Sequence, residues 1–285
     1  MKKYEIKKFK KDFIFIQEIN NKGSREKRTA IDKKGKKAIF KYEGYKCSEA
    51  CSEKLSYEIA KILKYDCAHI ELARDEKGTL GILNYLFVDI RKEEHIDAVA
   101  YIKKNNEERK QFHTLKNIKN CLDELDKKLF YEFLKILIFD ALVGEQDRHE
   151  ENWGIIRKDG TYKLSPLYDN GDNLLRQFYD ESYAQKFYNG EKDFDSFIKR
   201  SKTFIYKEDG KQYKHFELIK DLYKEYPEHI KNEISNLKKL TNEKIENIVN
   251  KMPDDIITNK HKEYIIKYIK ERKQILLDII LKGEW

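Results

Sequence analysis

Asp147-Arg148-His149-Glu150-Glu151-Asn152 and, further along, Pro166-Leu167-Tyr168-Asp169-Asn170 are the most informative stretches of this 285-residue chain. Between them lies Lys158-Asp159-Gly160, flanked by two apolar runs. An Asp-Gly step in that context is a strong hairpin signal. A hairpin here returns the chain, so the second stretch can lie beside the first. We therefore expect the side chains of Asp147, Asn152 and Asp169 to form one site.

These three side chains carry oxygen atoms of the kind that Mg²⁺ prefers. Asn152 and Asp169 would hold Mg²⁺ at the base of a cleft and leave room for the phosphates of ATP. Asp147 would then accept the proton of an acceptor hydroxyl during phosphoryl transfer. An aspartate followed five residues later by asparagine arises by chance about once in a chain of this size, so the prediction depends on the hairpin context. The alternative is that Asp147 caps a turn, Asn152 occupies a bend and Asp169 is an ordinary surface acid.

The periodicity of the surrounding residues predicts an α+β chain in which a sheet precedes a mainly helical part. A buried helix marked from Leu125 to Val143 ends at Gly144, and the tail from His215 is helical with an interruption at Met252-Pro253. In the first third, we expect antiparallel strands at residues 13–16, 28–31, 37–42, 70–74 and 79–88, with a helix at residues 48–65 that Ser52 caps.

These patterns indicate two lobes, a small antiparallel sheet lobe at residues 1–90 and a larger, mainly helical catalytic lobe at residues 91–285. In the sheet lobe, Lys41 ends a strand whose alternation directs it away from Phe40. A lysine there can reach the α and β phosphates of a nucleotide. Glu49, Glu53 and Glu58 on the following helix are the acids that could pair with it, or else solvated helix acids.

The run Phe139-Asp140, the segment 147–154 and the segment 164–171 closely resemble the HipA-like serine/threonine kinases, including their small stand-alone bacterial members of the CtkA type. The family pattern is an Asp-Arg-His-x-x-Asn loop and a Pro-Leu-Tyr-Asp turn, and both are intact here. The resemblance extends over the preceding sheet and the helical tail. It implies a bilobal, protein-kinase-like fold that uses ATP and Mg²⁺. Asp147 would be the catalytic base, Asn152 and Asp169 the metal ligands, and Arg148 and His149 would shape the loop.

The same resemblance implies further nucleotide contacts in the sheet lobe. Glu53 is favoured as the partner of Lys41, because it stands seven residues before Ala60 as in the helix of the family. Val88 and its neighbour would form the hinge that binds adenine. The turn Gly23-Ser24-Arg25-Glu26-Lys27 would be a phosphate loop, with Gly23, Ser24, Arg25 and Lys27 at the phosphates and Ser24 as a site of autophosphorylation. A plain basic turn is the alternative.

Composition limits the other functions. The formal charge of +8 is concentrated in residues 1–46, where 16 Lys and Arg stand against 6 Asp and Glu. Solvated lysines need no partner, so we do not expect nucleic-acid binding, although an acidic partner is compatible with this excess. No apolar run is long enough to span a bilayer or to act as a signal peptide. Four cysteines without a second close pair predict free thiols and no zinc site.

The function predicted from these observations is transfer of the ATP γ-phosphate to a serine or threonine hydroxyl of a protein. By resemblance, the chain would be a growth-arresting toxin or an effector, with an antitoxin or another regulatory partner, located in the cytoplasm or delivered to a host. Its protein substrate is not predicted. The alternatives are a phosphoinositide or small-molecule kinase, since related loops occur there, and a non-catalytic, pseudokinase-like binding module.

Overall fold

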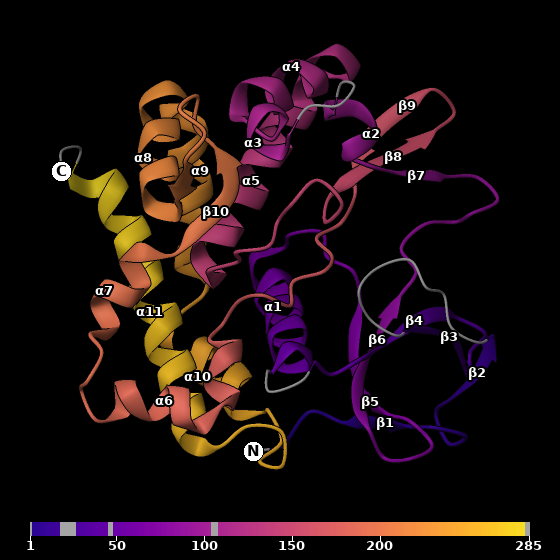
Figure 1. The fold of residues 1–285 in the computed structure, drawn as a ribbon. Coiled ribbons are helices and arrows are strands. Elements are labelled where there is room, and N and C mark those ends of the chain that lie inside the picture. The colour runs from indigo at the N-terminus through magenta and orange to yellow at the C-terminus, as the bar shows by residue number, and fades with distance from the viewer. Residues whose placement is uncertain (1, 18–26, 45–47, 104–107, 283–285) are drawn as a thin grey trace.

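The computed structural model describes residues 2–17, 27–44, 48–103 and 108–282. Figure 1 shows a curled sheet on one side, a mainly helical mass on the other, and helix α1 between them. The chain has the mixed α+β architecture expected from the sequence, with a sheet part and a larger helical part. The predicted boundary near residue 90 stays a prediction.

The larger sheet of the described residues has the strand order β1-β5-β6-β4-β3-β2. Strand β1 runs parallel to β5, whereas the other neighbours are antiparallel. The sequence did not predict β1, because three residues with a single apolar side chain carry no periodic signal. The last predicted strand was too long, since β6 ends at Tyr85 and not at Val88. The strands are β1 (Ile6–Lys8), β2 (Phe13–Gln17), β3 (Lys27–Asp32), β4 (Lys37–Tyr42), β5 (Ile70–Arg74) and β6 (Leu80–Tyr85).

Helix α1 (Glu49–Leu63) packs against one face of this sheet and against the helical half. Its apolar residues Leu55 and Ile59 are fully buried in a core that continues through both halves. The predicted cap was wrong: Ser48 is the N-cap, and Ser52 lies inside the helix. A separate cluster around Phe13 and Phe40 covers the opposite, outer face of the sheet.

The long buried helix predicted from Leu125 begins only after a helix break at Asp126. Helix α4 ends at Leu125, and Asp126 caps α5 by accepting a hydrogen bond from the backbone N–H of Lys128. The prediction of one helix containing Leu125 was therefore wrong at its start. Its end was correct, because Gly144 follows α5 in the left-handed conformation, and a side chain there would collide with Tyr268. The bounds are α2 (Val99–Ile102), α3 (Arg109–Phe112), α4 (Leu115–Leu125) and α5 (Lys127–Val143).

The predicted hairpin after α5 is present. Strands β8 (Gly154–Lys158) and β9 (Thr161–Leu164) meet at Asp159 and Gly160, which both have positive φ. Strand β7 (Glu94–Asp97), which was not predicted, adds to this hairpin. The remaining elements are η1 (Arg176–Tyr179), α6 (Glu181–Tyr188), α7 (Phe194–Arg200), β10 (Lys202–Tyr206), β11 (Gln212–Lys214), α8 (His215–Glu225), α9 (Pro227–Asn236), η2 (Leu237–Lys239), α10 (Asn242–Asn250) and α11 (Asn259–Lys282).

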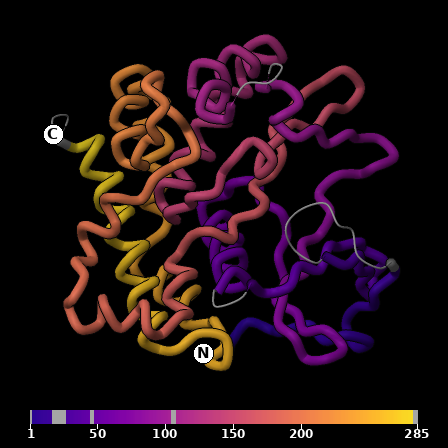
Figure 2. The backbone as a smooth tube through the Cα atoms, viewed as in Figure 1, coloured from indigo at the N-terminus to yellow at the C-terminus, as the bar shows by residue number. Residues whose placement is uncertain are grey.

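The two ends of the fold are connected. In Figure 2 the N-terminal segment runs beside the loop that precedes α11. The backbone N–H of Tyr4 donates to the carbonyl of Lys251 at 2.8 Å, and the ammonium of Lys3 contacts Asp254 at 2.8 Å. The predicted interruption at Met252-Pro253 forms this loop. Across the described ranges, none of the helices combines the length and apolarity that crossing a membrane requires.

Candidate active site

Lys41, Glu53 and Asp169 come together from three separate parts of the chain. The ammonium of Lys41, on β4, lies 2.9 Å from a carboxylate oxygen of Asp169 and 3.5 Å from one of Glu53, on α1. The competing acids of α1 have other partners: Glu58 pairs with Lys54, and Glu49 with Arg176. The geometry therefore selects Glu53, over Glu49 and Glu58, as the acid beside Lys41. That Lys41 and Glu53 bind ATP stays a prediction.

The charges of this cluster compensate one another. Burial opposes the charged form of Lys41, but Asp169 and Glu53 outweigh it and raise the pKa of the ammonium. Burial likewise opposes ionisation of Asp169, yet Lys41 lowers the pKa of that carboxyl to about 2. For Glu53 burial dominates, so its pKa is raised, and its Oε2 atom has no hydrogen-bond partner among the described residues. A charged Lys41–Asp169 pair therefore lies beside a carboxylate that retains one unpaired oxygen.

Asp147 and Asn152 occupy one tight loop after α5. The Asn152 amide nitrogen donates to the Asp147 carbonyl at 2.7 Å, which leaves the amide oxygen without a partner in the described chain. The Asp147 carboxylate is 47% exposed and lies 3.9 Å from Nε2 of His149. Partial burial raises the pKa of Asp147, His149 opposes this, and the negative charges of Asp172 and Asp169 add to the rise. The Asp147 carboxylate is therefore accessible and disposed to accept a proton.

Arg148 holds this loop against the Asp169 turn. Its guanidinium is buried and forms a two-pronged pair with Asp140 of α5, at 2.9 and 3.1 Å. It also donates to the carbonyl oxygens of Asn152 and Tyr168, at 2.8 and 2.7 Å, and to the side chain of Asn170 at 2.6 Å. Since these acceptors flank both Asn152 and Asp169, Arg148 sets the distance between the two predicted metal ligands.

A second buried network, which the sequence analysis missed, ties the same loop to α1. Glu145 accepts the backbone N–H of Asp147 at 2.8 Å and the side-chain amide of Asn173 at 3.0 Å. Asn173 in turn hydrogen-bonds to Ser56 and, through its carbonyl, to Ser52. The available signal was the recurrence of serine at every fourth position, Ser48, Ser52 and Ser56, which places the hydroxyls on one face of the helix.

Glu145 gives the fold a specific pH dependence. Burial raises its pKa well above the usual 4.5. Above pH 4.5 the unfolded chain gains free energy by ionising Glu145 while the folded chain keeps the proton, so stability falls as pH rises toward the folded pKa. We expect Glu145→Gln to reduce this loss of stability as pH rises above 4.5, as measured by urea unfolding. The exposed substitution Glu228→Gln is the control. An unchanged pH dependence in Glu145→Gln would show that folding does not raise the pKa of Glu145.

The residues present fit a magnesium ion bound together with phosphate. Asp169 and Asn152 supply hard oxygen donors, and beside the effect of burial the negative charges of Asp172 and Asp169 also raise the pKa of Asp147. The described residues contain no group of three or more His, Cys, Asp or Glu arranged to hold a metal alone. Mg²⁺ at nucleotide sites typically uses only one or two carboxylates and takes its other ligands from phosphates and water.

Apolar side chains on the Lys41 face of the sheet were also missed by the sequence analysis. Side chains alternate along a strand, and the register pairs Ile14 with Ile31 and Thr29 with Ile39. Ile14 is 49% exposed and Ile16 is 45% exposed. Ile14, paired with Ile31, lies opposite the Phe13 and Phe40 cluster and contributes an accessible apolar surface on the side of Lys41, suited to a planar base.

Of the other residues predicted to contact the nucleotide, only Lys27 lies beside the Lys41 cluster among the described residues. Gly23, Ser24 and Arg25 lie outside the described residues. Lys27 pairs with Lys41 across β3 and β4, and its charge contributes to the low pKa of Asp169. Val88 follows β6 and lines a hollow that shares no residue with the Lys41 cluster.

The fold and this arrangement define a protein-kinase-like architecture. A family model described as the HipA-like C-terminal domain matches residues 19–256. The chain therefore belongs to the HipA-like C-terminal domain family.

Individual proteins agree with this assignment. The chain is 25% identical, over 182 residues, to the serine/threonine-protein kinase CtkA of Helicobacter pylori; the match covers 57% of this chain and about half (52%) of that relative. The crystal structure of that proinflammatory kinase superimposes with a TM-score of 0.80 at 18% identity, covering 98% of both chains. HipA of Shewanella oneidensis, solved with HipB and operator DNA, gives a TM-score of 0.59 at 12% identity over 100% of this chain and 68% of that one. The two structural similarities establish the fold.

Proposed function

We propose that this chain is a Mg·ATP-dependent protein kinase that phosphorylates serine or threonine. One observation carries the proposal: Lys41 pairs with Asp169 and contacts Glu53, and the turn that carries Asp169 is held by Arg148 against the loop of Asp147 and Asn152. Membership of the HipA-like family and similarity to a serine/threonine-protein kinase support the same reaction.

Each residue has a distinct task in the proposed reaction. Lys41 binds the α and β phosphates, and Glu53 keeps the ammonium oriented. Asn152 and Asp169 hold Mg²⁺, which when bound neutralises charge on the β and γ phosphates. Asp147 orients the acceptor hydroxyl and accepts its proton. The hydroxyl oxygen forms a bond to the γ phosphorus, the bond from that phosphorus to the β–γ bridging oxygen breaks, and ADP leaves with the electron pair.

The apolar face around Ile14 and Ile39 is the proposed contact for the adenine base. It lies on the same side of the sheet as Lys41, so a nucleotide whose phosphates reach Lys41 can place its purine ring against these side chains. Burial of a planar ring there contributes binding free energy of about 25 cal/mol per Å² of apolar area. We propose this surface, in place of Val88 alone, as the adenine contact.

The reaction class is tested by incubating the purified chain with Mg²⁺ and γ-labelled ATP, and with protein, phosphoinositide or aminoglycoside acceptors in separate reactions. We expect label on serine or threonine of a protein, including the chain itself. Asp147→Asn should lower this rate by about a hundredfold or more, because the general base is lost, while Mg·ATP still binds. Asp126→Asn, which alters a helix cap far from the site, is the matched control.

Two outcomes would contradict the proposal. Labelling of lipid or aminoglycoside alone would assign another kinase class, and Mg·ATP binding without transfer to any acceptor would support a non-catalytic module. Mass spectrometry of the same reaction tests autophosphorylation at Ser24, where added phosphate would repel ATP. The absence of phosphate on that segment would remove Ser24 from the scheme. A toxin or effector role and a regulatory partner remain predictions that this assay does not address.

A further inference from the structure

A hollow of about 890 Å³ lies on the outer face of the six-stranded sheet, apart from the Lys41 site. Its lining includes Glu71 on β5, Tyr85 on β6, and the turn between β3 and β4. Glu71 pairs with Leu83, which pairs with Phe40, whereas Lys41 pairs with Ile82. Because side chains alternate, Glu71 and Tyr85 face away from Lys41. The hollow is therefore not part of the proposed catalytic centre.

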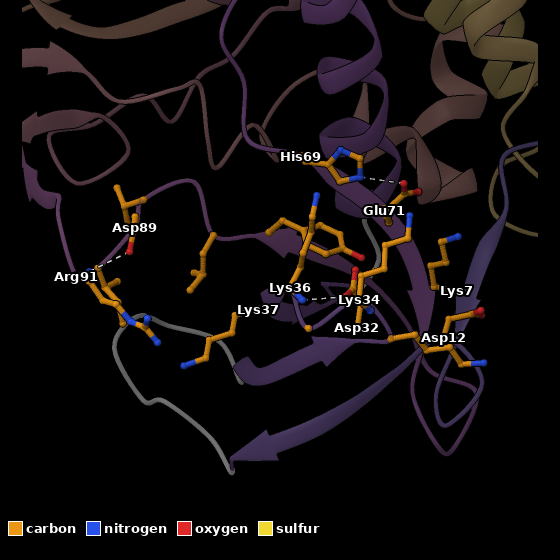
Figure 3. A pocket seen from close by; sticks show the side chains of 16 residues that line it. Lys7, Asp12, Asp32, Lys34, Lys36, Lys37, His69, Glu71, Asp89 and Arg91 are labelled. Carbon is orange, nitrogen blue, oxygen red and sulfur yellow. Dashed lines mark hydrogen bonds and ion pairs between the residues drawn. The ribbon is translucent and has the colours of Figure 1, made fainter.

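The rim of this hollow is positively charged. Lys34 and Lys36 come from the turn between β3 and β4, Lys37 begins β4, and Arg91 comes from the segment after β6. In Figure 3 the side chains of Lys37 and Arg91 extend from opposite sides of the opening toward the same space. Within the part of the chain that the structure describes, these cations form no ion pair. Part of the lysine excess of the N-terminal region therefore lies at this opening.

The acids of the hollow, by contrast, are already engaged. One oxygen of Asp32 accepts the backbone N–H groups of Lys34 and Lys36, at 2.8 and 2.9 Å. Asp89 accepts the backbone N–H of Arg91, and Glu71 contacts the ring of His69 at 2.9 Å. These local donors stabilise the carboxylates, while no described carboxylate pairs with the rim cations. An external anion would complement them.

Apolar side chains complete the lining. Leu86 is 42% exposed and Ile90 is 70% exposed, and both border the hollow. We propose that this surface docks an acidic segment of a protein partner, with apolar side chains between its acids. A nucleic acid fits less well, because a continuous phosphate backbone offers the exposed Leu86 and Ile90 no apolar side chains to pack against.

The test uses a short fluorescein-labelled peptide of alternating glutamate and leucine, and measures its fluorescence anisotropy on binding to the full chain. We expect saturable binding that weakens with added salt. The combined variant Lys34→Glu, Lys36→Glu, Arg91→Glu should weaken it by roughly tenfold or more, because like charges then face each other. The matched control reverses the charge of three exposed lysines on the helical side, as Lys116→Glu, Lys199→Glu, Lys231→Glu. It should bind the peptide as the wild type does.

Other outcomes overturn the proposal. Equal peptide affinity in the rim variant and the wild type would exclude this surface. If the lysine control lost as much peptide affinity as the rim variant, the effect would be due to net charge alone. An oligonucleotide of matched negative charge that binds at least as tightly as the peptide would identify a nucleic-acid surface. Binding is read out without ATP, so this result does not depend on the proposed kinase activity. Phosphoryl transfer by the rim variant should equal that of the wild type, since no substituted residue lies in the Lys41 site.

Discussion

Asp169→Asn lowers the expected rate of Mg·ATP-dependent phosphoryl transfer by about a thousandfold. The substitution keeps the size of the side chain but removes the charge that pairs with Lys41 at 2.9 Å and that we propose binds Mg²⁺. Both interactions act on the phosphates where charge develops during transfer, and loss of such electrostatic stabilisation typically costs a factor of this order. Single-turnover transfer of labelled phosphate at saturating ATP measures the effect.

The same variant separates chemistry from folding. Since the Asp169 side chain is 39% exposed, the loss of its ion pair should change the free energy of unfolding by only about 1 kcal/mol or less. Asp159→Asn, in the exposed hairpin turn, removes one carboxylate elsewhere and should leave the rate unchanged. Near wild-type transfer by Asp169→Asn would contradict the metal-binding role. So would ATP binding by the wild type that is equally tight with Mg²⁺ and with a chelator that removes it.

Arg148→Met carries the largest expected effect on stability, a loss of about 3–5 kcal/mol in the free energy of unfolding. Removal of the guanidinium leaves Asp140 buried and unpaired, which is far more costly than breaking an exposed pair. The carbonyls of Asn152 and Tyr168 lose their donor as well. Urea unfolding followed by circular dichroism measures this change.

Two controls locate the cause in the buried pair. Arg157→Met removes an exposed arginine that pairs with Glu94 and should cost less than about 1 kcal/mol. Adding Asp140→Leu to Arg148→Met should restore part of the lost stability, because no buried charge then lacks a partner. Equal costs for Arg148→Met and Arg157→Met would show that Arg148 is not the clamp described here.

Several features could be read from local sequence because local interactions determine them. Gly144 ends α5 because the left-handed conformation suits glycine, and the Asp159-Gly160 turn reverses the chain for the same reason. Helix α1 follows from apolar spacing. Strands β1 and β7 could not be found this way, since each is short and is held only by pairing with a distant strand.

The stretch from Asp147 to Asp169 by itself determined the kinase-like class and the family, because its residue types, spacing and hairpin are local properties. Only the tertiary structure decided which acid meets Lys41. Glu49 and Glu53 are four residues apart and share a helix face, so periodicity cannot separate them. Arg176, which lies far along the chain, pairs with Glu49 and leaves Glu53 beside Lys41. The Glu145–Asn173–serine network likewise depends on packing between α1 and a segment more than a hundred residues away, where local sequence carries no signal.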